Sequence, residues 1–520
     1  MIDAASRLGS RVLVLLLALC AALAGPAAAF AQTPASPHAP AAAPAPAQAP
    51  AAEKADASRL FPPDAVSRQA LAQGAKRLTY TATASTLPLL GPKGEVSARI
   101  FSVAYTLDEK SSARPVTFVF NGGPGAASAY LHLGAMGPRV VNFSTDGSAA
   151  VQPVALADNP DAWLDFTDLV FVDPVATGYS RSAAGTEEAD KAFFGVGKDV
   201  DALADFIRLT LNRSGRTLAP VFLAGESYGG FRVALLADAL IGNGIAVRGV
   251  VMISPALEFS MLRGNRYALL PLALVLPSIA ATHLERRDGA GASFDILPEV
   301  ERFARSSYLV HLASGLRKDA EIDRTLARYT GLPPDVIRSH HGRVSTRTFA
   351  HEYERSGERV LSRYDGTVSS PVPERSDIRF DPILEGATTV LTPAFDQYAR
   401  AELGYRTDLS YRLLNRDVSG RWDFGTSQTR QGFAGALDEL QRARARNPAL
   451  GVLITHGYTD LVTPYGVSQY LMDQLAPIEG ARPIEIKLYR GGHMMYLRAP
   501  SRRALTQDAR TFYRSVMKTP

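Results

Sequence analysis

Cysteine is almost absent from this chain: it has one in 520 residues, Cys20. This cysteine lies in an N-terminal apolar run, Val12 to Leu23, that follows Arg7 and Arg11 and precedes a small-x-small tripeptide ending at Ala31. A basic start, a short apolar run and a small-residue cleavage site are typical of an export signal. We therefore expect a signal peptide cut near Ala31, in a protein that is exported to the periplasm or secreted.

The chain after this signal contains no cysteine at all. An exported protein of this composition uses neither a disulfide nor thiol chemistry. Cys20 itself follows Leu19 rather than a small residue, so we expect simple cleavage in place of lipidation at Cys20. The apolar run is too short to span a bilayer comfortably, and we expect no membrane span after signal cleavage.

Other signals are missing as well. The sequence has no Cys/His spacing of a zinc site, no phosphate-binding loop and no internal repeat, so we expect no metal and no cofactor. Its 56 basic and 51 acidic residues are interspersed, and the formal net charge is only +5. A solvated surface explains this distribution, and we expect no nucleic-acid partner. The oligomeric state is left open.

Composition divides the chain into segments. Residues 1–31 are the predicted signal peptide, and residues 32–57 are dominated by Ala and Pro. Such a stretch cannot bury a core and predicts a flexible, partly extended linker. From Ser58 onward roughly 460 residues remain, which is ample for a large core with an inserted second lobe.

The folded part shows the pattern of an α/β sheet. An opening antiparallel pair is expected at Arg77 to Ser85 and Ala98 to Leu107, which alternate around a Gly-Pro-Lys-Gly turn. Short apolar runs without alternation follow, as in parallel strands buried on both faces. They are Val116–Phe120, Leu169–Val172, Val221–Ala224, Val250–Ile253, Val452–Thr455 and Ile484–Tyr489. Helical patterns between them, at Val200 to Leu211 and Phe231 to Ile241, predict a mostly parallel central sheet.

This alternation breaks between Ser254 and about Thr389. Leu297 to Leu316 and Ala320 to Tyr329 have helical patterns, and no buried strand is evident in this part. We interpret residues 255–389 as an inserted, largely helical cap over the strand ends. The core then consists of residues 58–254 and 390–520.

The stretch Pro220 to Phe231 carries the strongest functional signal. An apolar run ends in Gly-Glu-Ser-Tyr-Gly, centred on Ser227, and a helical pattern follows. Strand, tight glycine-flanked turn and helix form the context of a nucleophile elbow, in which the serine hydroxyl stands clear of the sheet at a helix N-terminus. A bare Gly-x-Ser-x-Gly also occurs in ordinary strand-to-helix turns, so the context decides for a nucleophile.

A glycine-rich loop follows the strand that ends at Phe120. It reads Asn121-Gly122-Gly123-Pro124-Gly125, and its glycines let backbone pass close to a ligand. In α/β-hydrolases one oxyanion donor is the N–H after the nucleophile, and the other comes from a loop after an earlier strand. Tyr228 and Gly123 fit these places.

Two late strand ends complete a candidate triad. Asp460 follows the strand at Val452 to Thr455, and His493 follows the strand at Ile484 to Tyr489. The order Ser227, Asp460, His493 is that of α/β-hydrolases. Asp460 would fix the histidine tautomer, and His493 would take the serine proton and return it to the leaving group.

Two other residues at strand ends are alternatives to His493 and Asp460. His456 also lies at a strand end, but it precedes Asp460 and so breaks the order. Asp173 is another acid at a strand end, but it precedes the serine. We therefore prefer His493 as the base and Asp460 as the acid.

The motifs together resemble the serine carboxypeptidase family, in a bacterial-type secreted form. The resemblance runs from about Thr79 to Phe512 and rests on five motifs in the right order. These are NGGPG at 121–125, DNPDAWLDFTDLVFVDPVATGYS at 158–180, GESYGG at 225–230, a late Gly-x-x-Asp at 457–460 and Gly-His-Met at 492–494.

The resemblance implies an α/β-hydrolase fold and the removal of single residues from peptides with a free C-terminal carboxylate. In the family this carboxylate is bound by the residues that match Asn121 and Glu226, and the Glu shares a proton with a second carboxylate at acidic pH. Gly122 joins this substrate site, and Met494 resembles a subsite residue near the leaving group, although simple packing would also explain it.

The sequence departs from the family pattern at three positions. Many members have a Glu where this chain has Ala135, a Cys where it has Ala126 and a Trp where it has Val119. The missing acid at position 135 leaves an esterase or acyltransferase with the same triad as an alternative. A non-catalytic binding protein on the same scaffold is the third hypothesis, and the intact triad residues count against it.

Overall fold

A computed structural model describes residues 60–109, 111, 113–262, 267–371, 381–425 and 434–518. These residues all belong to one compact unit, Ala55–Pro520. The predicted signal peptide, residues 1–31, and the predicted linker, residues 32–57, lie outside the described residues.

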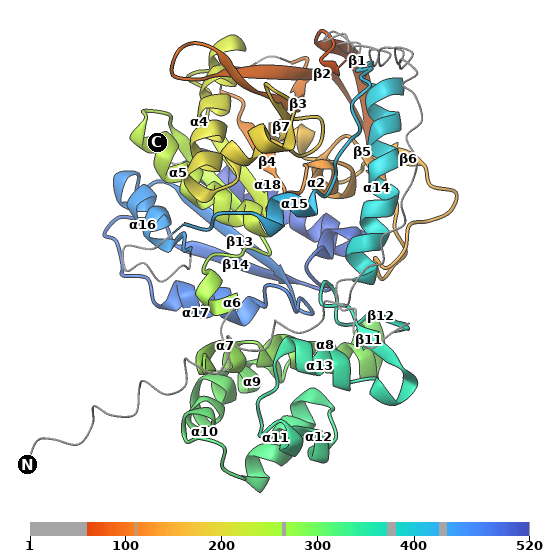
Figure 1. The fold of residues 1–520 in the computed structure, drawn as a ribbon, viewed down its shortest axis with the longest axis vertical. Coiled ribbons are helices and arrows are strands. Elements are labelled where there is room, and N and C mark those ends of the chain that lie inside the picture. The colour runs from red at the N-terminus through yellow and green to blue at the C-terminus, as the bar shows by residue number, and fades with distance from the viewer. Residues whose placement is uncertain are drawn as a thin grey trace, which may run out of the picture. The chain divides into compact units, whose positions relative to one another are not determined.

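One large sheet organises this unit (Figure 1). Its strand order is β1-β2-β3-β7-β4-β9-β10-β13-β14, and the short β8 pairs with β3. The pairs from β1 to β7 are antiparallel, and all later neighbours are parallel. The strands are β1 (Ala65–Gln73), β2 (Lys76–Leu90), β3 (Val96–Leu107), β4 (Val116–Phe120), β7 (Asp168–Val172), β8 (Arg181–Ser182), β9 (Val221–Glu226), β10 (Val247–Ile253), β13 (Gly451–Gly457) and β14 (Ile484–Tyr489).

The predicted strands are confirmed. The opening pair is β2 with β3, and each apolar run forms a strand of the parallel part. All five residues of β4 are buried, and they alternate between the two faces: Phe118 and Phe120 belong to one apolar cluster, and Val119 to the other. Burial on both faces explains why these sequences are continuously apolar.

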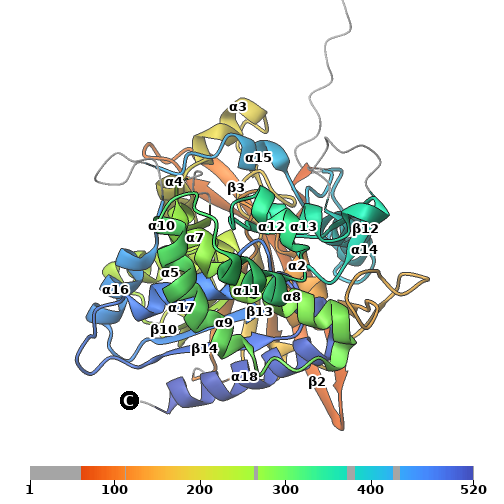
Figure 2. The same ribbon diagram turned by 90° about the horizontal axis from the view of Figure 1, so that it is seen from below.

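Helices cover both faces of the sheet. The cluster of Phe118 is closed by α4 (Val196–Arg213), α5 (Tyr228–Gly242) and α16 (Leu437–Arg446). The cluster of Val119 is closed by α14 (Pro382–Ala401) and α18 (Ala499–Met517). Figure 2 shows β10, β13 and β14 between α5 and α18. A mostly parallel sheet between helical layers, with the nucleophile turn after β9, is the α/β-hydrolase fold.

The helix α4 illustrates how the pattern leads to packing. Its buried apolar residues Leu203, Phe206, Ile207 and Leu211 recur at helical spacing on one face, which packs toward the sheet. The charged residues between them point outward.

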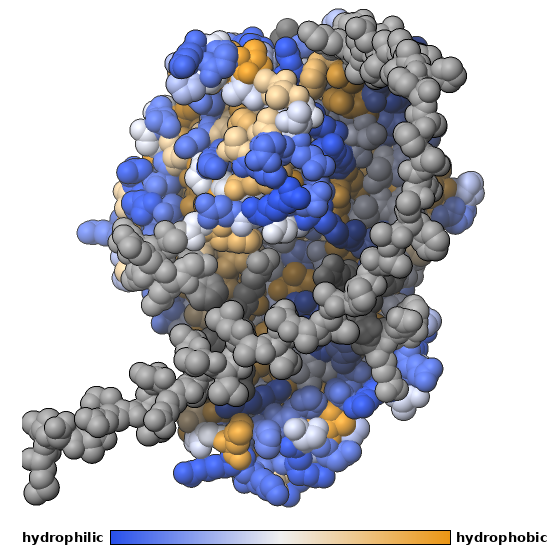
Figure 3. Space-filling view, in the orientation of Figure 1, coloured by the Kyte–Doolittle hydropathy of each residue, from blue (hydrophilic) through white to orange (hydrophobic). Residues whose placement is uncertain are grey.

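Short helices fill much of the stretch predicted as a cap. They are α6 (Phe259–Leu262), α7 (Leu269–Leu274), α8 (Leu276–Asp288), α9 (Leu297–Phe303), α10 (Leu309–Ala313), α11 (Ala320–Thr330), α12 (Pro334–Ser339) and α13 (Thr346–Glu352). Figure 1 shows α7 to α13 grouped together. They share their own apolar cluster, which includes Leu326 and Phe349, and hydrophilic side chains cover much of their outer surface in Figure 3.

Contacts between α7, α8 and α17 (Tyr465–Asp473) join this helical insertion to the core. The insertion also contains a small hairpin, β11 (Arg359–Leu361) with β12 (Ser369–Pro371). The expected boundary at residue 389 falls inside α14, which packs on the core cluster from Ile383 onward. We therefore propose that the insertion ends before Pro382.

Some elements had no counterpart in the predictions. The strand β1 extends the antiparallel end of the sheet, and a small hairpin joins β5 (Arg139–Val141) to β6 (Leu156–Asp158). In the part of the chain that the structure describes, no helix is long and apolar enough to cross a membrane.

Candidate active site

Ser227 lies in a sharp turn between β9 and α5. Its backbone has φ 59° and ψ −120°, a left-handed conformation that L-residues rarely adopt. The turn needs glycines on both sides: a Cβ on Gly225 would lie 2.0 Å from the carbonyl oxygen of Gly229, and one on Gly229 would lie 2.6 Å from that of Phe120. This is the geometry of a nucleophile elbow, and it places the serine at the N-terminus of α5.

The Asp460 carboxylate and the His493 imidazole are paired. Nδ1 of His493 lies 2.9 Å from Oδ2 of Asp460, and the two residues are 2% and 0% exposed. The Thr463 hydroxyl donates to Oδ2 of Asp460 at 2.7 Å, and the Val462 and Thr463 amides donate to Oδ1. With Nδ1 held by the acid, Nε2 is the nitrogen left for a serine proton.

The charges of this pair support each other. Burial disfavours the ionised carboxylate, but His493 and the donors of its own loop hold the pKa of Asp460 below its usual value. Burial likewise disfavours an imidazolium, but Asp460 and, more weakly, Glu226 raise the pKa of His493 above its usual value. The surroundings therefore stabilise the positively charged form of the His493 imidazole.

Ser227 and His493 are connected through the end of β10. The Ser227 amide donates to the carbonyl oxygen of Ile253 at 2.9 Å, and the hydroxyl of the next residue, Ser254, donates to the carbonyl oxygen of His493 at 2.8 Å. Among the described residues, no hydrogen bond joins the Ser227 hydroxyl to the His493 imidazole. Such bonds often form only when substrate is bound.

The glycine-rich loop lies against the elbow. A Cβ on Gly122 would be 2.6 Å from the Tyr228 nitrogen, so only glycine permits this approach. Gly123 has φ 100°, also a conformation suited to glycine. The Tyr228 N–H is at the first position of α5, where an amide has no intrahelical acceptor. The structure thus brings together the loop and the amide expected to form an oxyanion hole.

Glu226 is held by two hydrogen bonds. Its Oε2 accepts from the Asn121 side chain, and its Oε1 accepts from the Tyr496 hydroxyl at 2.9 Å. Burial raises the pKa of Glu226 to about 7, although His493, Tyr496 and Asn121 each act to lower it. A carboxyl group of this kind is protonated in acidic solution and can then donate a hydrogen bond.

Asn121 is itself fixed from two sides. Its Oδ1 accepts from the Leu131 amide at 3.1 Å, and its backbone carbonyl accepts from the guanidinium of Arg232 at 2.6 Å. Arg232 is buried and paired with Asp199. Sequence reasoning missed Arg232, because a basic residue in an apolar helix pattern gives no sign of its partner.

Tyr496 was also missed, and it bears on the departure at position 135. Ala135 is buried in the π-helical turn η1 (His132–Met136). A Cβ on the neighbouring Gly134 would lie 3.1 Å from the Tyr496 ring, so this ring packs against the segment where many family members have an acid. The hydroxyl of Tyr496 reaches Glu226, and the only available sequence signal was its position three residues after His493.

The rival residues have other partners. His456 is fully buried, its Nε2 lies 2.8 Å from the Ser468 hydroxyl, and burial lowers its pKa to about 4. Asp173 accepts hydrogen bonds from the Ser128 amide and hydroxyl. Met494 is 5% exposed and belongs to the apolar cluster of Val119.

Comparisons with known proteins relate part of the chain to one family. Residues 92–248 match the family model described as serine carboxypeptidase. The chain is 28% identical over 172 residues to a carboxypeptidase Y homolog of Arthroderma benhamiae, covering 32% of this chain and 31% of that protein. It is 32% identical over 165 residues to the pheromone-processing carboxypeptidase KEX1 of Cryptococcus gattii, covering 30% of this chain and 22% of that protein.

The similarity is partial on both sides. A third relative, the serine carboxypeptidase ctsa-3.1 of Caenorhabditis elegans, is 29% identical over 145 residues, which are 26% of this chain and 23% of that protein. The chain therefore matches less than a third of the length of these relatives. The family-matched stretch contains the loop of Asn121 and the elbow of Ser227, whereas Asp460 and His493 lie beyond it.

Proposed function

We propose that this chain, a relative of the serine carboxypeptidases, is an exported enzyme that releases C-terminal residues from peptides through an acyl-enzyme on Ser227. The observation that carries this proposal is the buried Glu226 carboxyl, next to the nucleophile and bonded to Asn121. A buried carboxyl that is protonated below about pH 7 can donate a hydrogen bond to a substrate carboxylate. It suits the recognition of a charged substrate end.

The reaction proceeds in two steps. Ser227 Oγ attacks the last peptide carbonyl carbon while His493 takes its proton, and the Gly123 and Tyr228 amides stabilise the oxyanion. The C–N bond then breaks, and His493 gives the proton to the leaving amine. Water, deprotonated by His493, attacks the acyl carbon and releases Ser227.

Carboxylate recognition depends on the protonation of Glu226. Below about pH 7 the carboxyl is protonated, so that it and Asn121 both donate hydrogen bonds to the terminal carboxylate, with the Gly122 backbone beside them. Above this pH the two carboxylates repel each other. Glu226 is also one of the negative charges that raise the pKa of His493, so protonation of Glu226 favours the neutral imidazole that catalysis needs.

An esterase or acyltransferase with the same triad is the second candidate. The observation that favours it is Ala135, since Glu226 has Tyr496 and not a second acid beside it. One fold and one triad serve many acyl chemistries. A non-catalytic binding protein ranks last, and labelling of Ser227 by a fluorophosphonate would exclude it.

The test compares hydrolysis of an N-blocked dipeptide and of a simple ester with the same acyl group, in acidic to neutral solution. The proposal predicts that the dipeptide is cut and that Glu226→Gln changes its KM but not the KM of the ester. A strong preference for the ester, with no effect of Glu226→Gln on either substrate, would favour the second candidate. Tyr80→Phe is the control variant, because the Tyr80 hydroxyl donates to Gln69 outside this site. It should keep the wild-type KM for both substrates.

A further inference from the structure

The segment 363–366, between β11 and β12, runs across the loops that carry Asp460 and His493. The Leu461 amide donates to the carbonyl oxygen of Arg363 at 3.0 Å, and the His493 amide donates to that of Tyr364 at 2.5 Å. The Gly366 amide donates to the carbonyl oxygen of Thr459 at 3.1 Å. A single stretch of the insertion is therefore bonded to both candidate triad loops.

The Asp365 side chain adds a contact to each loop. Its Oδ1 accepts from the Thr459 hydroxyl at 2.8 Å, and its Oδ2 accepts from the Gly492 amide at 3.1 Å. Thr459 immediately precedes Asp460, and Gly492 immediately precedes His493. One buried carboxylate thus bridges the residues that stand directly before the acid and the base.

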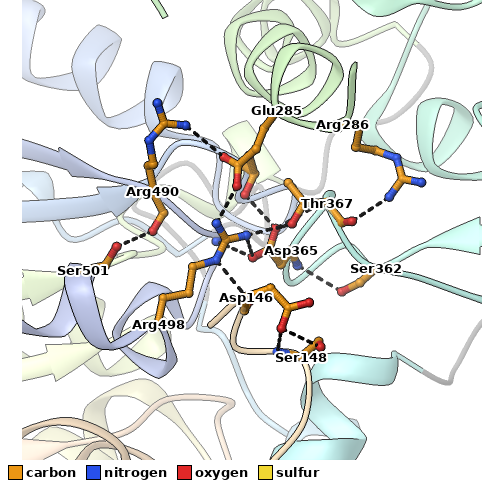
Figure 4. Close-up of polar contacts among 12 residues, drawn as sticks. Asp146, Ser148, Glu285, Arg286, Ser362, Asp365, Thr367, Arg490, Arg498 and Ser501 are labelled. Carbon is orange, nitrogen blue, oxygen red and sulfur yellow. Dashed lines mark hydrogen bonds and ion pairs between the residues drawn. The ribbon is translucent and has the colours of Figure 1, made fainter. Parts of the chain in front are cut away.

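Arg498 fixes this carboxylate (Figure 4). Its guanidinium lies 2.8 Å from Oδ2 of Asp365 and 2.5 Å from Oε1 of Glu285, which comes from α8 of the insertion. Burial acts to lower the pKa of Arg498, but the carboxylates of Asp365 and Glu285 raise it overall. The three side chains are each less than 10% exposed, so their charges interact with little screening by solvent.

The histidine loop and the segment 363–366 are closely packed at Gly491 and Gly492. A Cβ on Gly492 would lie 1.8 Å from the carbonyl oxygen of Tyr364 and 2.5 Å from the Cα of Asp365. A Cβ on Gly491 would lie 3.1 Å from the Arg498 side chain. The histidine loop therefore packs directly against Tyr364 and Asp365 of the insertion.

Backbone bonds join the two loops as well, since the Tyr458 amide donates to Tyr489 and the Thr459 amide to Gly491. These bonds fix the strand ends but not the tips. At the tips, the 2.9 Å contact between Asp460 and His493 requires both loops to be placed to within a fraction of an ångström.

We propose that Asp365, held by Arg498, is a positioning residue that aligns Asp460 with His493 and ties this alignment to the helical insertion. The proposal rests on the proposed role of His493 as the base. Asp365 contacts neither Ser227 nor the carboxylate site of Asn121 and Glu226. Its substitution should therefore change the rate of the chemical step and not substrate binding.

The test uses a fluorophosphonate probe on the full chain, because labelling requires the triad but not peptide recognition. Ser227 Oγ attacks phosphorus, the P–O bond forms as fluoride leaves, and His493 takes the proton. The maximal labelling rate and the half-saturating probe concentration are measured separately. Asp365→Ala should lower the maximal rate about 10- to 100-fold, as expected for a displaced base, and leave the half-saturating concentration unchanged.

Asp365→Asn retains an acceptor oxygen and should recover part of the rate. Thr459→Val removes only the hydrogen bond between the Thr459 hydroxyl and Asp365, and it should lower the maximal labelling rate less than Asp365→Ala. The matched control is Asp161→Ala, which removes the partner of Arg502. Asp161 and Arg502, which lies on α18, form a second buried ion pair outside this cluster. The control variant should label at the wild-type rate.

Two results would overturn the proposal. One is a folded Asp365→Ala protein that labels at the wild-type maximal rate. The other is a maximal labelling rate of Asp161→Ala that falls as far as that of Asp365→Ala. If Asp365→Ala does not fold, Asp365→Asn and Thr459→Val decide, and wild-type rates in both would contradict the positioning role. Failure of the wild-type protein to label would instead contradict the proposed function. Failure to cut peptides despite normal labelling would contradict only the substrate assignment.

Discussion

The Tyr496 hydroxyl donates a 2.9 Å hydrogen bond to Oε1 of Glu226. It occupies the place where a second carboxyl group could share a proton with Glu226. A tyrosine with a strongly raised pKa stays neutral, so it donates to the Glu226 carboxylate and does not compete with it for a proton. The ionisation of Glu226 in this chain is therefore set by burial, His493, Asn121 and Tyr496.

Tyr496→Phe should shift the pH dependence of peptide binding upward. The lost donor stabilises the ionised carboxylate, so its removal raises the pKa of Glu226 further and extends the protonated form to higher pH. A hydrogen bond to a charged group contributes about 1.5–3 kcal/mol, which corresponds to a shift of about one to two pH units. The measurement is kcat/KM for a free-carboxylate peptide against pH.

The matched control is Tyr489→Phe. Its hydroxyl donates to the Asp508 carboxylate at 2.7 Å, which is the same chemistry away from Glu226. This variant should keep the wild-type pH profile. If the pH profile of Tyr496→Phe were unchanged or shifted to lower pH, Tyr496 would not act on Glu226.

Glu226→Gln should remove the loss of peptide affinity near neutral pH. If Glu226 binds the substrate carboxylate as proposed, the wild-type carboxyl donates to it below about pH 7, whereas above this pH the charges repel and KM rises. Glutamine donates at every pH. The KM of Glu226→Gln for a free-carboxylate peptide should therefore stay constant from acidic to mildly alkaline solution. If KM rose with pH in this variant as much as in the wild type, Glu226 would not be the residue that recognises the carboxylate.

The same variant gives a stability test. Because the folded-state pKa of Glu226, about 7, lies above the ordinary value of 4.5, the folded protein holds this proton more tightly. Its contribution to stability is fully present below about pH 4.5 and is lost as pH rises through about 7. The difference in unfolding free energy between wild type and Glu226→Gln should shift by about 3 kcal/mol across this window, in favour of the variant at higher pH.

Gly225→Ala should abolish a stable elbow. The new methyl group would lie 2.0 Å from the carbonyl oxygen of Gly229, which is backbone and cannot swing away. We expect a loss of about 3 kcal/mol or more, or no folded protein. Urea unfolding measures the loss.

Gly197→Ala in the first turn of α4 is the control for this change. A Cβ there meets no atom within 4 Å, so the substitution should be neutral or stabilise the protein by up to about 1 kcal/mol. Equal stability of the two variants would contradict the packing described for the elbow.

The sequence predicted those parts of the molecule in which neighbouring residues decide the structure. Continuous apolar runs predicted the parallel strands, since each is buried on both faces. The glycines around Ser227 predicted the sharp turn, because no larger residue fits at Gly225 or Gly229. Chain order led to Asp460 and His493, which the structure places 2.9 Å apart.

Contacts between distant segments were not predictable. Tyr496 and Glu226 are 270 positions apart, and Arg498 and Glu285 are 213 apart. No periodicity or spacing encodes such a pair, since each residue is ordinary in its local pattern. The strand β1 was missed because its intermediate burial makes its pattern weak. The expected end of the insertion falls inside α14, which packs on the core cluster.

The most direct test of the central claim is the release of the last residue from an N-blocked dipeptide and from its C-terminal amide, by the wild type and by Ser227→Ala. The account predicts that in mildly acidic solution the wild type cuts the free-carboxylate peptide far faster than the amide, and that Ser227→Ala cuts neither. Equal rates on the two peptides would contradict the carboxylate site of Asn121 and Glu226. Undiminished activity of Ser227→Ala would contradict the acyl-enzyme itself.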